Sequence, residues 1–394
     1  MGNSLINSGH TEMPLLKEGD GTLVLFHPFI PEEAAAEVAD TLASRWIGEG
    51  PKVKRFEREF SVMEGGGLPA VAAGAGTDAL HIAYKLCGLD SESEVIAPLF
   101  TCTATNIPLL QERTKIRFVD VMPDSLNMDV SKIRGMINEK TKAIVCVHYG
   151  GLPCDLDELS AIEKEFGIPV IQDGAHALGL RWRGHPMSHW SSYTMYSFQA
   201  IKHITTGDGG MLIINSDNGS ELIEKARRLR WFGIEREKKL GGIWDNDIRE
   251  IGYKYQMTDV AASIGLSALP HVEALLQHRR KLLSIYQERL SDAEGIKYFS
   301  GAVDGDSKYE HGAWLCTVLA ERRLELQKML YEHGIESNQV HYRNDRYSIF
   351  NKSVGNEGYP NMDRINDDYL VLPLHHKITE EQVHHICNLI SKGW

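Results

Sequence analysis

The chain has 394 residues, with 42 Lys and Arg against 54 Asp and Glu, so its formal net charge is −12. An acidic chain without clustered Lys and Arg lacks the electrostatic footprint of a nucleic-acid-binding protein. No stretch approaches the roughly 20 apolar residues that span a bilayer, and residues 1–25 contain no apolar core of signal-peptide length. The six Cys residues show no CxxC spacing. We therefore expect a reduced, cytoplasmic protein with neither nucleic-acid nor membrane partners.

Short apolar runs alternate with helix-like segments between about residues 70 and 215. Four of these runs are rich in Val and Ile, at residues 94–97, 116–119, 143–147 and 169–172. Continuous apolar runs separated by helices are typical of strands that are buried on both faces of a mainly parallel sheet. The ends of such strands, and a ligand with them, lie along one edge of the sheet.

The pattern changes after about residue 261. Residues 260–290 predict a long helix that is interrupted by Pro270. Beyond it lie three further elements, strand-like at 313–319 and helix-like at 321–333 and 380–391. We therefore expect an α/β fold with two lobes. A large domain, residues 1–265 with an N-terminal arm, precedes a smaller α+β domain, residues 266–394.

One lysine stands in an unusual setting. Lys202 follows a strand-like run, residues 193–198, and precedes the glycine-rich turn Gly207-Asp208-Gly209-Gly210. A lysine amine attacks carbonyl groups only when it is neutral, which burial or a neighbouring cation can bring about. Most lysines are solvated surface groups, so this segment alone does not decide its role.

Two other segments supply what such a lysine needs in a pyridoxal-phosphate enzyme. Asp173 follows the apolar run 169–172, where a carboxylate faces the ligand edge of the sheet and can keep a pyridine nitrogen protonated. A helix N-cap would look the same. The small residues up to Gly76 and Thr77 lead into a helix, whose first N–H groups bind phosphate, although a tight turn with a Thr cap is the alternative. Together the three segments predict an enzyme that uses pyridoxal 5'-phosphate.

Further motifs extend over the chain from about residue 46 to residue 374. Besides the Asp173 and Lys202 segments they are WIGEGPKV at 46–53, FVDV at 118–121, HYGGLPCD at 148–155, GYKYQMTD at 252–259 and LPL at 372–374. In these motifs the chain resembles the DegT/DnrJ-type nucleotide-sugar aminotransferases, a branch of the fold-type I pyridoxal-phosphate enzymes. The resemblance implies a large domain with a mainly parallel sheet and a smaller C-terminal domain.

The resemblance also implies roles for individual residues. Lys202 would form the Schiff base with the cofactor, and Asp173 would pair with the pyridinium nitrogen. His176 would sit beside the ring, near its phenolic oxygen. The residues implied to bind the cofactor phosphate are Gly76, Thr77 and Ser197.

Three positions depart from the family's pattern. Lys254 stands where relatives carry an Asn that reaches the phosphate from the other subunit, and we expect its charge to do the same in a homodimer with shared active sites. Cys102 takes the place of the aromatic residue that contacts the cofactor, so ring stacking is weaker or comes from elsewhere, such as Phe100. Gln256 stands where Arg is frequent.

The reaction implied is transamination in two halves. L-glutamate or L-glutamine would give its amino group to the cofactor and leave pyridoxamine 5'-phosphate, with Lys202 as general base and acid. The second half would aminate a nucleotide-linked keto-deoxy sugar, as in surface polysaccharide biosynthesis. Candidate contacts to that sugar are Trp46, His341 and Arg343.

Three alternatives stand beside this interpretation. The acceptor could be a small phosphorylated ketone or ketose instead. A sugar dehydratase of the same family would carry His in place of Lys202, and the spacing from Ser197 selects Lys202 rather than His203. A non-catalytic regulatory relative should have lost Asp173, Lys202 or the phosphate cradle, and all three are present. No metal site is expected, because residues 146–155 lack a recognised ligand spacing.

Overall fold

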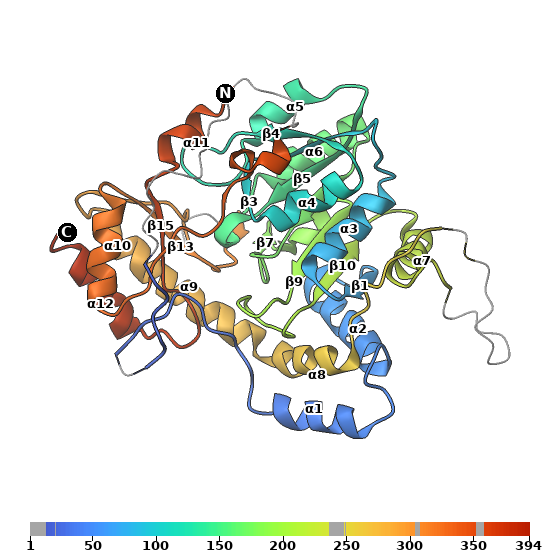
Figure 1. The fold of residues 1–394 in the computed structure, drawn as a ribbon, viewed down its shortest axis with the longest axis horizontal. Coiled ribbons are helices and arrows are strands. Elements are labelled where there is room, and N and C mark those ends of the chain that lie inside the picture. The colour runs from blue at the N-terminus through green and yellow to red at the C-terminus, as the bar shows by residue number, and fades with distance from the viewer. Residues whose placement is uncertain (1–12, 20, 236–247, 249, 304–307, 352–357) are drawn as a thin grey trace.

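A computed structural model describes residues 13–19, 21–235, 248, 250–303, 308–351 and 358–394. Its centre is a seven-stranded sheet with the order β1-β10-β9-β6-β5-β2-β4 (Figure 1). These strands are β1 (Ala70–Ala73), β2 (Glu94–Pro98), β4 (Lys115–Val119), β5 (Thr141–Val147), β6 (Val170–Asp173), β9 (Tyr193–Ser197) and β10 (Gly210–Ile214). Strand β10 runs antiparallel to both of its neighbours, and the other four pairs are parallel. The predicted α/β fold with a mainly parallel sheet is confirmed.

Helices cover both faces of this sheet, which is why its strands are continuously apolar. The helices of the large lobe are α1 (Ala34–Ala43), α2 (Pro51–Gly65), α3 (Gly76–Leu86), α4 (Thr103–Gln111), α5 (Ile133–Met136), α6 (Leu156–Phe166) and α7 (Gly219–Arg230). In β2, Val95 and Ala97 pack in a cluster with residues of α3 and α4, whereas Ile96 packs with residues of α2 and α6 on the other face. Side chains alternate between the faces along a strand, so both faces need apolar residues.

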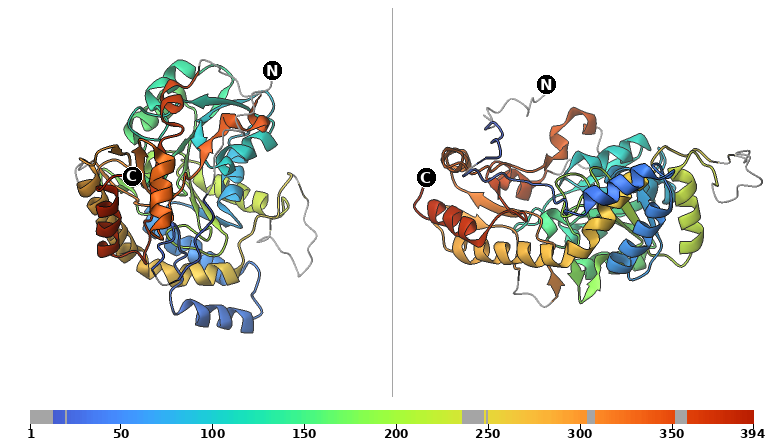
Figure 2. Two further views of the ribbon diagram at one scale, coloured as in Figure 1. Left: turned by 60° about the vertical axis from the view of Figure 1, so that its left-hand side comes forward. Right: turned by 90° about the horizontal axis from the view of Figure 1, so that it is seen from below.

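A broken helix leads to the smaller lobe. It consists of α8 (Asp259–Ala268), a 3-10 turn at Leu269–His271 that contains Pro270, and α9 (Val272–Leu290). The predicted interruption at Pro270 is confirmed. The smaller lobe holds the sheet β11 (Ile296–Tyr298), β13 (Cys316–Ala320) and β15 (Tyr369–Leu372), with α10 (Arg323–Glu332) and α12 (Glu380–Ile390). These helices lie at the end of the molecule opposite α7 (Figures 1 and 2).

The strand predicted at 313–319 begins three residues late. Ala313 has a φ of 49°, in the left-handed region, and the N–H groups of Trp314 and Leu315 both donate to the carbonyl oxygen of Gly150. Residues 313–315 therefore bond to a turn of the large lobe, and they bring Trp314 to that turn. The regular strand starts only at Cys316.

Segments of each lobe cross to the other. Strand β14 (Tyr342–Arg343) pairs with β3 (Phe100–Thr101), and the short helix α11 (Pro360–Ile365) begins with N–H donors to Asp120. At the other end of the chain, Leu23 N donates to the oxygen of Gly334 at 2.8 Å. The boundary at 265/266 stays a prediction.

A second, small three-stranded sheet is formed by β12 (Tyr309–Glu310), β7 (Arg181–Trp182) and β8 (His185–Pro186). Of the helices in the described parts of the chain, none has the length and apolar character that crossing a membrane requires.

Candidate active site

Asp173 is the last residue of β6, at the carboxyl edge of the parallel strands. It is 5% exposed, and its carboxylate is held by two donors. Thr105 Oγ1 donates to Oδ2 at 2.7 Å, and the backbone N–H of Ala175 donates to Oδ1 at 3.0 Å. Burial raises the pKa of Asp173, while these hydrogen bonds and the nearby Lys202 oppose the rise. The side chain is thus fixed in place and is close to a cation.

Lys202 lies in the turn after β9, with its Nζ 4.0 Å from the ring centroid of Trp314. Burial lowers the pKa of Lys202 to about 8, and the charges of Asp173 and Cys102 oppose this effect. Among the residues that the structure describes, no carboxylate forms an ion pair with this amine. A substantial neutral fraction is therefore present near neutral pH, as a carbonyl-attacking lysine requires.

The start of α3 forms the third part of the site. The helix begins at Gly76, and the preceding Ala75 offers no side chain to cap its first N–H groups. A Cβ on Gly76 would lie 3.0 Å from the Cβ of Ser197 and 3.2 Å from its Oγ, so glycine allows Ser197 to approach the helix start. Uncapped N–H groups, the half-buried Thr77 and a serine hydroxyl form a suitable cradle for a phosphate.

His176 lies four residues beyond the end of the run at 169–172 and contacts groups from distant parts of the chain. Its Nδ1 accepts a hydrogen bond from the N–H of Gly150 at 3.3 Å. Its ring stacks on Trp314 with centroids 3.8 Å apart, and its Nε2 lies 3.3 Å from Nε2 of His341. Trp314 is not among the residues predicted for the site, because no residue spacing in the sequence indicates that it contacts His176.

These residues fit pyridoxal phosphate. A carboxylate, an amine of lowered pKa and a cradle that a Cβ at Gly76 would fill converge from β6, the turn after β9 and the start of α3. A negatively charged ring substituent would meet the helix start, and a ring nitrogen would meet Asp173. The individual roles of the residues stay predictions.

Comparison with known proteins gives the family. The model of the DegT/DnrJ/EryC1/StrS aminotransferase family matches residues 28–391. The chain belongs to this family.

Relatives of known name support the same placement. The UDP-4-amino-4-deoxy-L-arabinose–oxoglutarate aminotransferase of Shewanella sediminis is 35% identical over 279 residues, 70% of each chain. The sugar aminotransferase CalS13 of Micromonospora echinospora is 30% identical, with a TM-score of 0.87 over 94% of this chain and all of that chain. The sugar aminotransferase Spr1654 of Streptococcus pneumoniae, solved in a PLP form, is 27% identical, with a TM-score of 0.83 over 94% and 98% of the two chains. The protein is thus a pyridoxal-phosphate-dependent aminotransferase of fold type I.

The three unusual positions of this aminotransferase lie at different depths. Cys102 is partly buried directly before α4, near Lys202. Lys254 is exposed, and its Nζ donates to Gln256 at 2.6 Å and lies 3.8 Å from the ring centroid of Trp231. Gln256 in turn donates to Glu49, whose other oxygen accepts from Arg230 at 2.6 Å.

The candidate sugar contacts differ in their exposure and in the partners that hold their side chains. Arg343 pairs with Asp345 at 2.7 Å and with Asp363, and these bonds raise its pKa. Trp46 is 43% exposed and lines a cavity of about 1060 Å³ between α2 and α7. His341 lies beside His176. Phe100 is 1% exposed and packs edge-on against Tyr149 and Tyr369 in the core.

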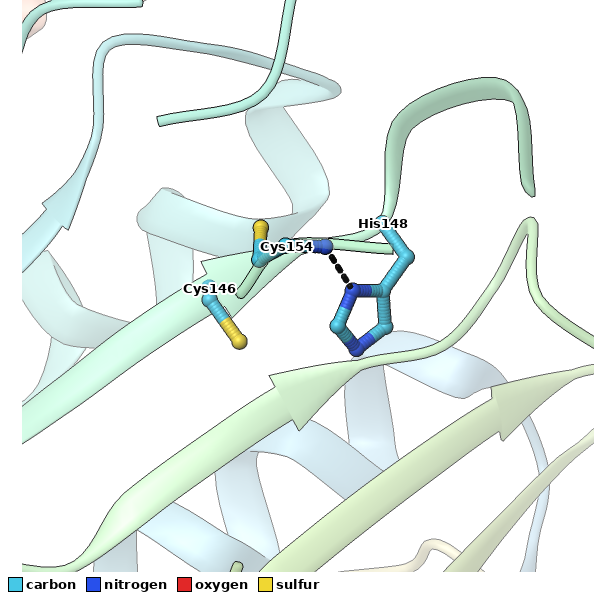
Figure 3. A group of neighbouring side chains, drawn as sticks. All are labelled: Cys146, His148 and Cys154. Carbon is cyan, nitrogen blue, oxygen red and sulfur yellow. Dashed lines mark hydrogen bonds between the residues drawn. The ribbon is translucent and has the colours of Figure 1, made fainter. Parts of the chain in front are cut away.

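One group in the described parts of the chain brings three potential metal ligands together, namely Cys146, His148 and Cys154 (Figure 3). The nitrogens of His148 are both engaged, since Nδ1 accepts from the N–H of Cys154 at 3.1 Å and Nε2 lies 2.7 Å from Gln172 Oε1. The amide nitrogen of Gln172 already donates elsewhere, so its oxygen is the acceptor from Nε2. A ring that donates at one nitrogen and accepts at the other has no lone pair left for a metal. The group is a packed hydrogen-bonded cluster.

Proposed function

We propose that this aminotransferase moves an amino group from L-glutamate or L-glutamine to the keto carbon of a nucleotide-linked keto-deoxy sugar. The observation that supports it best is the convergence of Lys202, Asp173 and the start of α3 at one edge of the sheet. The relative from Shewanella sediminis supports the substrate class, because its name joins a UDP-linked amino sugar to oxoglutarate, the keto acid of glutamate.

Bound pyridoxal phosphate supplies an aldehyde that condenses with amines and a ring that accepts electrons. Lys202 would provide the amine that holds the resting cofactor, and its neutral Nζ would take a proton from the donor's α-carbon and return it to the cofactor. The negative charge of Asp173 faces the ring nitrogen, because Thr105 and the N–H of Ala175 hold both carboxylate oxygens in place. The start of α3 binds the phosphate and so fixes the distance to Lys202.

The same proposal includes a homodimer in which each site takes Lys254 from the other subunit. Lys254 is exposed on its own chain, and apolar side chains nearby are exposed as well, with Phe232 at 44% and Ile251 at 81%. Exposed apolar side chains that lie together mark a candidate interface. The N–H of Gly74 donates to the carbonyl oxygen of Tyr255 at 2.7 Å. The segment that holds Lys254 therefore also contacts the residues before α3, next to the phosphate cradle of its own subunit.

Hybrid dimers test this sharing. Mixing Lys202→Ala with Lys254→Asp subunits should restore activity to a fraction of sites, since one of the two sites in a hybrid has both lysines intact. No gain above the separate variants would contradict a shared site.

Absorption spectra test the reaction itself. Protein with bound pyridoxal phosphate should show a near-visible band that L-glutamate bleaches, and a keto acceptor should restore it. The acceptors are nucleotide-linked 4-keto sugars and, as a matched set, small phosphorylated ketones. Restoration only by the phosphorylated ketones would replace the sugar nucleotide with the alternative acceptor class. A band that no amino donor bleaches would refute the transaminase proposal.

A further inference from the structure

His176 has a hydrogen-bond partner at each ring nitrogen. The N–H of Gly150 points to Nδ1 at 3.3 Å, and Nε2 lies 3.3 Å from Nε2 of His341. A backbone N–H can only donate, so Nδ1 of His176 must be unprotonated. The neutral ring then carries its hydrogen on Nε2, where it faces Nε2 of His341 as the acceptor. His341 therefore carries its own hydrogen on Nδ1.

The backbone of His341 is held in a conformation that suits this contact. Its φ of 66° lies in the left-handed region, which residues other than glycine rarely adopt. Tyr369 donates its hydroxyl to the carbonyl oxygen of His341 at 2.7 Å, and Tyr149 donates to that of Val340 at 3.0 Å. Such uncommon conformations persist where the surroundings determine them and gather at functional sites. Here two buried tyrosines hold the backbone that carries the ring.

The two imidazole rings lie nearly parallel to each other, beside an indole ring. Their planes differ by 5° with centroids 5.2 Å apart, and Trp314 stacks on His176 and lies within 20° of the plane of His341. Burial lowers the pKa of His341 to about 3 and holds that of His176 well below its usual value. The charged or titratable side chains near His176 are Lys202, His341, His203, His148 and Tyr149. Those near His341 are Lys202, His176 and Tyr149. Both rings are thus neutral at physiological pH, as the bond between them requires.

We propose that His341 is a positioning residue, whose Nε2 accepts the hydrogen on Nε2 of His176 and, together with the N–H of Gly150 at Nδ1, holds the orientation of the His176 ring beside the cofactor. The inference rests on the proposed function, in which His176 lies beside the cofactor ring. His341 acts through His176, and its position in the chain, 165 residues away, gives no sign of this.

Two variants of His341 separate a bonding role from a packing role. His341→Phe keeps a flat ring but has no acceptor, whereas the amide oxygen of His341→Gln can still accept from His176. Thermal unfolding of each variant shows whether it is folded. Nitrogen-15 NMR of histidine-labelled protein without cofactor then reads the tautomer of His176, with His176→Gln used to assign its signals.

Wild-type protein should show His176 protonated on Nε2 only. His341→Phe should keep Nδ1 of His176 unprotonated, because the N–H of Gly150 remains, but should shift the Nε2 signal, whose hydrogen loses its acceptor. It should bind pyridoxal phosphate about fivefold more weakly, the effect of one net hydrogen bond. His341→Gln should keep the wild-type tautomer and bind within about twofold of wild type. The pH titration of the cofactor band should move in His341→Phe and stay in His341→Gln.

A wild-type His176 protonated on Nδ1 would overturn the inference. So would a folded His341→Phe with the wild-type Nε2 signal of His176 and the wild-type titration, even if it transaminates slowly, because His341 would then contact only substrate. Failure of the proposed function is a separate outcome. In that case wild-type protein forms no cofactor band, while the Nε2 signal of His176, compared without cofactor between wild type and His341→Phe, still decides the role of His341.

Discussion

Two buried cationic side chains of this protein differ in whether a carboxylate pairs with them. Arg230 is 4% exposed, and its guanidinium binds Glu57 at 2.7 Å, Glu49 at 2.6 Å and the carbonyl oxygen of Ala72 at 2.8 Å. Lys202 lies over the ring of Trp314 and, among the described residues, has no carboxylate within ion-pair distance. Burial lowers its pKa to about 8, with the charge of Asp173 only partly opposing the shift.

The difference separates a structural charge from a reactive one. A buried charge that is fully paired contributes to the fold, and removing its partner is costly. A buried amine that is left unpaired is unstable as a cation, loses its proton readily and becomes a nucleophile. Four variants or conditions test this difference.

The largest effect is expected from Lys202→Ala. Transamination should fall at least about 1,000-fold, because the variant loses both the cofactor linkage and the group that moves the proton. Steady-state rates with L-glutamate and an acceptor measure the loss. Lys328→Ala is the matched control, since Lys328 is exposed and pairs with Glu332 on the helix surface. An equal loss in both variants would contradict a specific role for Lys202.

Removing the paired cation should damage the fold instead. Arg230→Met leaves Glu49 and Glu57 buried without their guanidinium and should lower the free energy of unfolding by about 3–5 kcal/mol. Arg227→Met, which breaks a largely exposed ion pair with Glu224, should change it by less than about 1 kcal/mol. Denaturant titrations of the two variants make the comparison. Equal stability would show that the Arg230 network contributes nothing.

Asp173→Asn tests the partner of Lys202. The amide has the size of the carboxylate but lacks its charge, so kcat should fall about 100-fold or more while the protein stays folded. Rapid-mixing absorption measurements should place the loss in the half-reaction with L-glutamate. A loss below tenfold would mean that the ring nitrogen has another partner.

The smallest effect is the dependence of cofactor attachment on pH. Only neutral Lys202 reacts, and a pKa of about 8 raises the neutral fraction about tenfold between pH 7 and pH 9. The rate at which cofactor-free protein acquires the near-visible band should follow this curve and level off above pH 9. A rate that keeps rising beyond pH 10 would indicate a solvated lysine with an ordinary pKa.

The sequence predicts the scaffold well because local patterns determine it. The apolar runs at 94–97 and 143–147 became β2 and β5, and Pro270 marks the turn between α8 and α9. The segments with Gly76, Asp173 and Lys202 could be recognised because each lies at the end of a strand or the start of a helix, where parallel topology brings such ends together.

What the sequence could not provide is contact between distant segments. Trp314 reaches His176 only because residues 313–315 bond to the turn at Gly150, and His341 depends on hydroxyl groups of Tyr149 and Tyr369. Periodicity reports which face of an element is buried, but not which residue of another element it meets. The pairing of Arg230 with Glu49 and Glu57 was missed for the same reason.

The central claim is that Lys202 is the amine that binds the cofactor. Borohydride reduction of the protein with pyridoxal phosphate, followed by mass analysis of its peptides, tests it most directly. We expect one reduced phosphopyridoxyl group per chain, on Lys202, with Lys254 and the surface lysines unlabelled. Label on another lysine, with Lys202 unmodified, would contradict it.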